Sequence, residues 1–218
     1  MENKKILYVI GSLQIGGTEK QVIGLANEIC KRGHNVTLAL LSDYQSPSSF
    51  YLEKEISVLL LDLRFFKTPI KALRNLPKFL RLVLKEKFDV VQAFLPESVL
   101  IAIPVFLIFS PKTLRISSVR GSIVRRSKLL HSIYVTILNF SDLVICNSLD
   151  LSTMVEKEYG INKRKIFFIQ NAIKMPEIQL NENVLNKVAV ISNFHPYKGY
   201  RTLFQAITMV SDNVLFLL

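Results

Sequence analysis

Short apolar runs alternate with segments of helical periodicity along most of the chain. Such runs are typical of strands that are buried on both faces of a parallel sheet. The segments that we interpret as strands are 6–10, 36–41, 57–61, 89–93, 114–119, 143–146 and 165–169. Between them, apolar positions recur three or four residues apart, which predicts helices. These helices cover 16–32, 69–87, 97–109, 128–139 and 149–159.

Strand alternating with helix predicts an α/β fold, a Rossmann-like doubly wound parallel sheet with helices on both faces. Ligands of such sheets bind at the carboxyl ends of the strands. The segments that matter most for function therefore follow Ile10, Ala93, Val119, Cys146 and Ile169.

The rhythm breaks after residue 175. A polar stretch with three Asn at 176–187 indicates a linker, and 188–218 starts a new strand–helix–strand pattern. A piece of this size cannot close a hydrophobic core by itself. We therefore expect a domain at 1–175, a linker at 176–187 and an incomplete, truncated second α/β domain at 188–218.

Positive charge is concentrated in two windows of a chain whose formal net charge is +11. Residues 64–87 carry eight Lys or Arg and one Glu, and residues 112–128 carry six and no acid. Such a field attracts phosphate groups. The two cysteines lie far apart without zinc spacing, which favours a reducing, cytoplasmic compartment and no metal site. No apolar run is long enough for a membrane span.

The window at 69–87 combines charge with helical spacing. Apolar residues fall at 70, 73, 76, 80, 83 and 84, and the basic residues are Lys71, Arg74, Lys78, Arg81 and Lys85. One interpretation is a basic helix facing an anionic membrane, on the inner face of the plasma membrane. The other is a helix docked on the sheet with its lysines in water. Nucleic-acid binding is not expected, because no aromatic residues are interleaved with the charges as stacking platforms.

Three segments at the predicted rim offer candidate binding residues. The loop from Gly11 lacks the lysine of a phosphate loop, but Gly16 and Gly17 open a helix whose free N–H groups suit an anion. Arg120 follows the run at 114–119 and suits a phosphate or sugar hydroxyl. Ser148 follows 143–146. The alternatives are a packing turn for the glycines, a surface helix cap for Arg120 and a helix cap for Ser148.

These segments, in this order, resemble the retaining GT-B glycosyltransferases of family 4. ILYVIGSLQIGGTEK resembles the family's opening strand and glycine loop, and FDVVQAF its fourth strand. ISSVRGS, SDLVICNS and KIFFIQNAI resemble later landmarks. VAVISNFHPYKGYRTLFQAI resembles the start of the donor-side domain. The resemblance covers the whole chain.

The resemblance implies a metal-independent hexosyltransferase without a cofactor. It would move a sugar from a nucleotide-sugar to a glycan or lipid-linked acceptor, in polysaccharide or lipopolysaccharide biosynthesis. Gly16, Gly17, Arg120 and Ser148 would lie near the donor phosphates and acceptor, and Lys198 matches the family's phosphate-binding lysine.

The chain also departs from the family's pattern. Gln92 and Phe94 stand where the family often has a histidine, and Asn193 replaces an arginine. The catalytic residues are therefore not identified. The isolated chain is expected to be incomplete or inactive, with a second chain as one way to complete the donor side. The alternative is a non-catalytic membrane-peripheral or partner-binding module.

Overall fold

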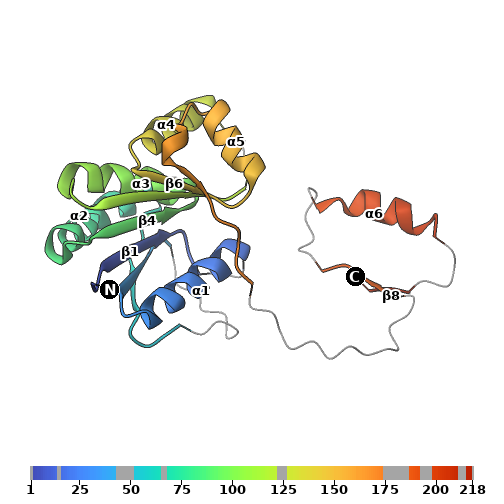
Figure 1. The fold of residues 1–218 in the computed structure, drawn as a ribbon, viewed down its shortest axis with the longest axis horizontal. Helices are drawn as coiled ribbons and strands as arrows, with labels where there is room; N and C mark the ends of the chain where they lie inside the picture. The colour runs from blue at the N-terminus through green and yellow to red at the C-terminus, as the bar shows by residue number, and fades with distance from the viewer. Residues whose placement is uncertain are drawn as a thin grey trace. The chain divides into compact units, whose positions relative to one another are not determined.

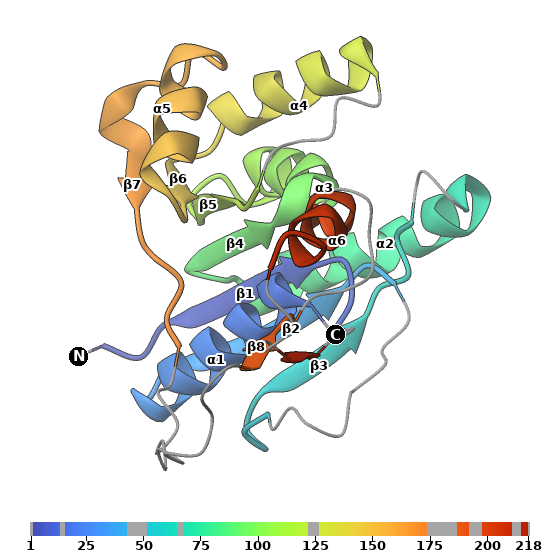
Figure 2. The same cartoon turned by 90° about the vertical axis from the view of Figure 1, so that its right-hand side faces the viewer.

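The computed structural model describes residues 2–13, 16–42, 52–64, 68–121, 127–173, 187–191, 198–210 and 215–217. They form two compact units, Met1–Ala172 and Ile173–Leu218. Each unit is considered by itself below (Figures 1 and 2).

The first unit alternates strands and helices in the predicted order. Its strands are β1 (Lys5–Ile10), β2 (Asn35–Leu40), β3 (Ser57–Leu60), β4 (Val90–Phe94), β5 (Leu114–Val119), β6 (Leu143–Cys146) and β7 (Ile166–Phe168). Its helices are α1 (Gly17–Lys31), α2 (Pro69–Glu86), α3 (Leu95–Phe109), α4 (Lys128–Asn139), α5 (Leu149–Lys157) and the short 3-10 helix η1 (Lys163–Lys165).

All seven strands form one parallel sheet in the order β3-β2-β1-β4-β5-β6-β7. The chain starts in the middle with β1, moves outward to β3, returns to β4 and then moves outward the other way. The predicted doubly wound α/β sheet is thus confirmed. Because the strands are parallel, their carboxyl ends share one edge, which we call the carboxyl rim.

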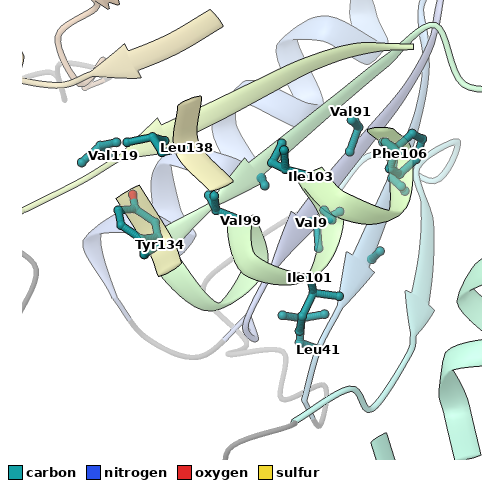
Figure 3. Close-up of a cluster of buried hydrophobic side chains, with 14 of the residues drawn as sticks. Val9, Leu41, Val91, Val99, Ile101, Ile103, Phe106, Val119, Tyr134 and Leu138 are labelled. Atoms are coloured by element: carbon teal, nitrogen blue, oxygen red, sulfur yellow. The ribbon is translucent and has the colours of Figure 1, made fainter. Parts of the chain in front are cut away.

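The two faces of the sheet carry unequal helical cover. Helix α1 packs on one face of β1 and β2, where Tyr8 and Leu38 are buried. Helices α2 to α5 contribute to the core on the other face, around Val9 and Val91. Figure 3 shows part of this second cluster, with Phe106 of α3 beside the strands. The central strands β1, β2 and β4 are buried on both sides, which explains why their segments are mainly apolar.

Helix α2 corrects one expectation from the sequence. Its docking stripe is formed by positions 72, 76, 79 and 83, of which Ala72, Phe79 and Val83 are buried. Ile70, Leu73 and Leu84, which the sequence analysis grouped into one apolar side, are exposed. Spacings of four, three and four residues place the docking stripe on one line along the helix, so the other apolar residues point elsewhere.

The second unit consists of β8 (Lys187–Ala189), α6 (Tyr200–Ile207) and β9 (Leu215–Leu217). Strands β8 and β9 pair in parallel as a separate two-stranded sheet. Residues 188–218 therefore do not extend the first sheet in the part of the chain that the structure describes. The predicted linker at 176–187 lies outside the described residues, apart from Lys187 at the start of β8.

Helix α3 is apolar at most positions but has 15 residues. Within the described ranges, none of the helices combines the length and apolar character needed to cross a bilayer.

Candidate functional site

The first element of the carboxyl rim is the amino end of α1. Gly16 is the N-cap residue with an extended backbone, and Gly17 is the first residue of the helix. A Cβ on Gly16 would overlap the carboxylate of Glu19, the third helical residue, which folds back over the cap. An acid at this position is favoured by the positive end of the helix dipole. A Cβ on Gly17 would meet no atom of the other described residues within 4 Å. An anionic ligand would thus approach beside Gly17 or displace the Glu19 carboxylate.

Arg120 forms the second element, directly after β5. Its guanidinium lies over the ring of Phe94, with its central carbon 5.5 Å from the ring centroid. Nη1 donates a hydrogen bond of 2.7 Å to Oδ1 of Asn171. Nε is buried and has no hydrogen-bond partner among the described residues. Burial lowers the pKa of Arg120, yet an arginine side chain remains charged at neutral pH. The site thus holds a fixed, half-buried cation with N–H groups that are still available to a ligand.

The segment after β7 connects these two elements. Nε2 of Gln21 donates to the carbonyl oxygen of Ala172 at 2.7 Å, and the Ala172 N–H donates to Oε1 of Gln21 at 3.0 Å. Gln21 lies near the start of α1, and Ala172 follows the residue that binds Arg120. One short segment therefore joins the start of α1 to Arg120 along the rim, through Asn171 and Ala172.

Gln21, Asn171 and Phe94 are rim residues whose roles the sequence analysis missed. Phe94 stands where the family often has a histidine, and its ring face supports the Arg120 cation. The local signals were the resemblances of FDVVQAF, which ends at Phe94, and of KIFFIQNAI, which contains Asn171, to family landmarks. Gln92 is buried inside the sheet and donates to Oγ of Ser118 at 2.8 Å, so its side chain is bonded within the sheet.

Ser148 is the N-cap of α5, as one of the two interpretations of the sequence had it. The backbone N–H of Leu151 donates to its Oγ at 3.2 Å. Its carbonyl oxygen also accepts from the hydroxyl of Ser152 at 3.0 Å. The Ser148 Oγ thus accepts a hydrogen bond from the helix, although its hydroxyl hydrogen can still donate to a ligand.

We predict that Ser148→Ala lowers the free energy of unfolding by about 1 kcal/mol, because the Leu151 N–H loses its side-chain acceptor. Chemical denaturation followed by circular dichroism measures the change. Ser152→Ala is the matched control, since its hydroxyl bonds a carbonyl inside the helix. Equal stability of the wild type and Ser148→Ala would show that the cap contributes nothing.

Lys198 lies in the second unit, where it is exposed and precedes α6. The structure therefore brings Gly16, Gly17 and Arg120 together at the carboxyl rim. Ser148 follows the neighbouring strand β6, and Lys198 belongs to the second unit. The five basic residues of α2 (Lys71, Arg74, Lys78, Arg81 and Lys85) are all exposed. The described residues contain no group of three or more His, Cys, Asp or Glu side chains arranged to hold a metal ion.

The carboxyl rim lies where ligands of doubly wound α/β proteins bind, and the comparison with known families gives the class of this protein. The family model described as Glycosyltransferase Family 4 matches residues 15–175, most of the chain. The chain therefore belongs to glycosyltransferase family 4, and the first unit has the fold of a GT-B amino-terminal domain. A search of curated protein sequences found no match.

Several solved structures share this fold. HepE of Anabaena in complex with UDP-glucose is 20% identical with a TM-score of 0.73, over 98% of this chain and 60% of that one. A glycosyltransferase of Rickettsia africae is 14% identical with a TM-score of 0.65, over 96% and 58%. The lipopolysaccharide outer core galactosyltransferase WaaB is 13% identical with a TM-score of 0.66, over 95% and 58%. The chain thus spans about 60% of the length of HepE.

Proposed function

We propose that the chain is the acceptor-side part of a retaining glycosyltransferase that moves a hexose from a nucleoside diphosphate donor to a glycan or lipid-linked acceptor. The observation that carries the proposal is the convergence at the carboxyl rim. Arg120, fixed over Phe94 and bonded to Asn171, lies on the same edge as the glycine-opened start of α1. A fixed cation and free N–H groups stabilise the negative charge of a departing diphosphate.

Similarity to solved relatives supports the choice of donor and acceptor. HepE was crystallised with UDP and with UDP-glucose, which favours a UDP-sugar here. WaaB is a lipopolysaccharide outer core galactosyltransferase, which favours polysaccharide or lipopolysaccharide biosynthesis here. Further donor contacts would come from a second domain, in the same polypeptide or in a partner chain, and Lys198 would be one of them.

The reaction we propose needs no metal or other cofactor, because Arg120 and the start of α1 supply positive charge for the diphosphate. It takes place in the cytoplasm, at the inner face of the plasma membrane. The two free cysteines, Cys30 and Cys146, are consistent with a reducing compartment.

Ligand-observed NMR with UDP-glucose tests this function on the chain as it is. We expect saturation transfer from the protein to the protons of UDP-glucose, competition by UDP and no effect of EDTA. Absence of transfer at millimolar UDP-glucose would reject donor binding at the carboxyl rim of this chain. Transfer that EDTA abolishes would reject the metal-independent part alone.

Gly17→Ala makes the proposal specific to the rim. The added methyl group meets no described atom, so the free energy of unfolding should stay the same or rise by up to about 1 kcal/mol. The same methyl group narrows the approach to the start of α1 and should weaken UDP-glucose binding at least several-fold.

The matched control is Gly24→Ala, inside the same helix and equally open. It should leave binding unchanged. Wild-type affinity of the Gly17→Ala variant would show that the ligand does not use the start of α1.

A further inference from the structure

The outer surface of the helices α2, α3 and α4 exposes apolar side chains that sugar transfer does not use. On α2, Ile70 is 78% exposed and Leu73 is 66% exposed. Helix α3 packs against both α2 and α4, so the three helices form one layer over the sheet. We call the exposed set the outer apolar strip; it consists of Ile70, Leu73, Leu84, Ile108, Leu130 and Ile133.

The contacts of α2 fix the direction in which its part of the strip faces. Lys71 forms an ion pair with Asp62, and Nζ of Lys78 donates to the carbonyl oxygen of Leu60 at 2.9 Å. That flank of α2 therefore faces the end of β3. Leu73 and Leu84 lie about 120–140° around the helix axis from Lys78, given roughly 100° per residue. They consequently lie on the flank toward α3.

Helices α3 and α4 continue the strip. Helix α3 carries a single charge, Glu97, in its first turn, and Ile108 near its end is 68% exposed. On α4 the buried positions are Tyr134 and Leu138, and the neighbouring Ile133 is exposed. All three helices of the layer thus expose aliphatic side chains, which favours an interaction surface over this layer.

Cations border the strip on α2. Arg74, Arg81 and Lys85 are exposed and form no ion pair with the described residues. The acid near them, Glu86, pairs with Lys5 at 3.6 Å. An apolar surface bordered by unpaired cations matches the chemistry of an anionic lipid bilayer, which offers both an apolar phase and phosphates. A nucleic acid offers phosphates without the apolar phase.

We propose that this surface docks on an anionic membrane, with the outer apolar strip inserted among the lipid headgroups and Arg74, Arg81 and Lys85 bound to lipid phosphates. The helical layer lies on one face of the sheet, so a bilayer there runs parallel to the sheet and the carboxyl rim opens along its surface. The docking needs neither donor nor acceptor, so its failure would leave the proposed transferase function standing.

Tryptophan reporters test the insertion directly, because the natural sequence contains no Trp. Leu73→Trp places one on the strip. Phe167→Trp places one on the other face of the sheet, since Ile166 packs toward the helical layer and Phe167 points the opposite way. Both side chains are exposed, so both variants should fold, which circular dichroism checks.

The expected result is selective for position and for lipid. With vesicles of phosphatidylcholine and phosphatidylglycerol, the Leu73→Trp emission should shift to shorter wavelength and become protected from a water-soluble quencher. Phe167→Trp should do neither, and vesicles of pure phosphatidylcholine should give a much weaker response of Leu73→Trp. Equal responses of the two variants, or no response of Leu73→Trp, would overturn the proposal.

The cations are tested by the triple variant Arg74→Ser, Arg81→Ser and Lys85→Ser in the Leu73→Trp background. It should need about a hundredfold more anionic lipid for half-maximal binding, from three lost surface contacts. Raising the salt concentration should weaken binding without abolishing it, because the inserted strip remains. Complete loss at high salt, or binding of duplex DNA in preference to vesicles, would contradict insertion into a membrane.

Discussion

Replacing Arg120 with Ala is expected to weaken UDP-glucose binding about ten- to hundredfold. A hydrogen bond to a charged group contributes about 1.5–3 kcal/mol, which corresponds to this range. The guanidinium has donors left after its bond to Asn171, and its Nε lacks a partner among the described residues. A titration followed by ligand-observed NMR measures the loss.

The same strand supplies a matched control. Arg115 lies near the other end of β5, where Nη2 bonds Oδ1 of Asp142 at 2.7 Å. Arg115→Ala removes this ion pair and should lower the free energy of unfolding more than Arg120→Ala does. It should leave UDP-glucose binding unchanged, because Arg115 is remote from the carboxyl rim. If both variants lose affinity in proportion to their stability, Arg120 acts in the fold and not on the ligand.

Much of the fold could be predicted from the sequence, because local signals agree with it. The predicted bounds of β5, α4 and β6 match those of the structure. Most strands are short, mainly apolar runs bounded by polar or turn-forming residues, and each helix has apolar residues at helical spacing. The Ser148 cap could be predicted for the same reason, since a serine directly before a helix has a well-defined local use.

The rim was only partly predictable, because its contacts join distant residues. Gln21 and Ala172 are 151 positions apart, and Arg120 and Asn171 are 51 apart. Periodicity places such residues on the rim but does not pair them. Helix α2 shows a second limit: apolar residues occur on two of its flanks, and spacing alone does not say which flank docks on the sheet. Phe79 settles this in the structure, because it is fully buried.

The side chain of Phe94 contributes both to the hydrophobic core and to the site at the carboxyl rim. Its ring is fully buried and contacts Tyr8 edge to face, with centroids 5.5 Å apart. Phe94→Ala should therefore lower the free energy of unfolding by about 3–5 kcal/mol. Phe94→Leu keeps most of the volume and should cost less than about 1.5 kcal/mol. Denaturant unfolding of the two variants measures both losses in free energy of unfolding. Equal losses would show that filling the volume of the Phe94 side chain does not stabilise the fold.

Phe94→Leu then isolates the contact with Arg120. The leucine fills the core but has no π face, so the guanidinium loses the support that holds it at the rim. A double-mutant cycle with Arg120→Ala should give a coupling free energy of about 0.5–2 kcal/mol in stability. Phe94→Leu should lower the affinity for UDP-glucose when Arg120 is present. It should cause no further loss of affinity in the Arg120→Ala variant. Additive losses would mean that Phe94 and Arg120 act independently, and the rim would then have to be preorganised by the Asn171 contact alone.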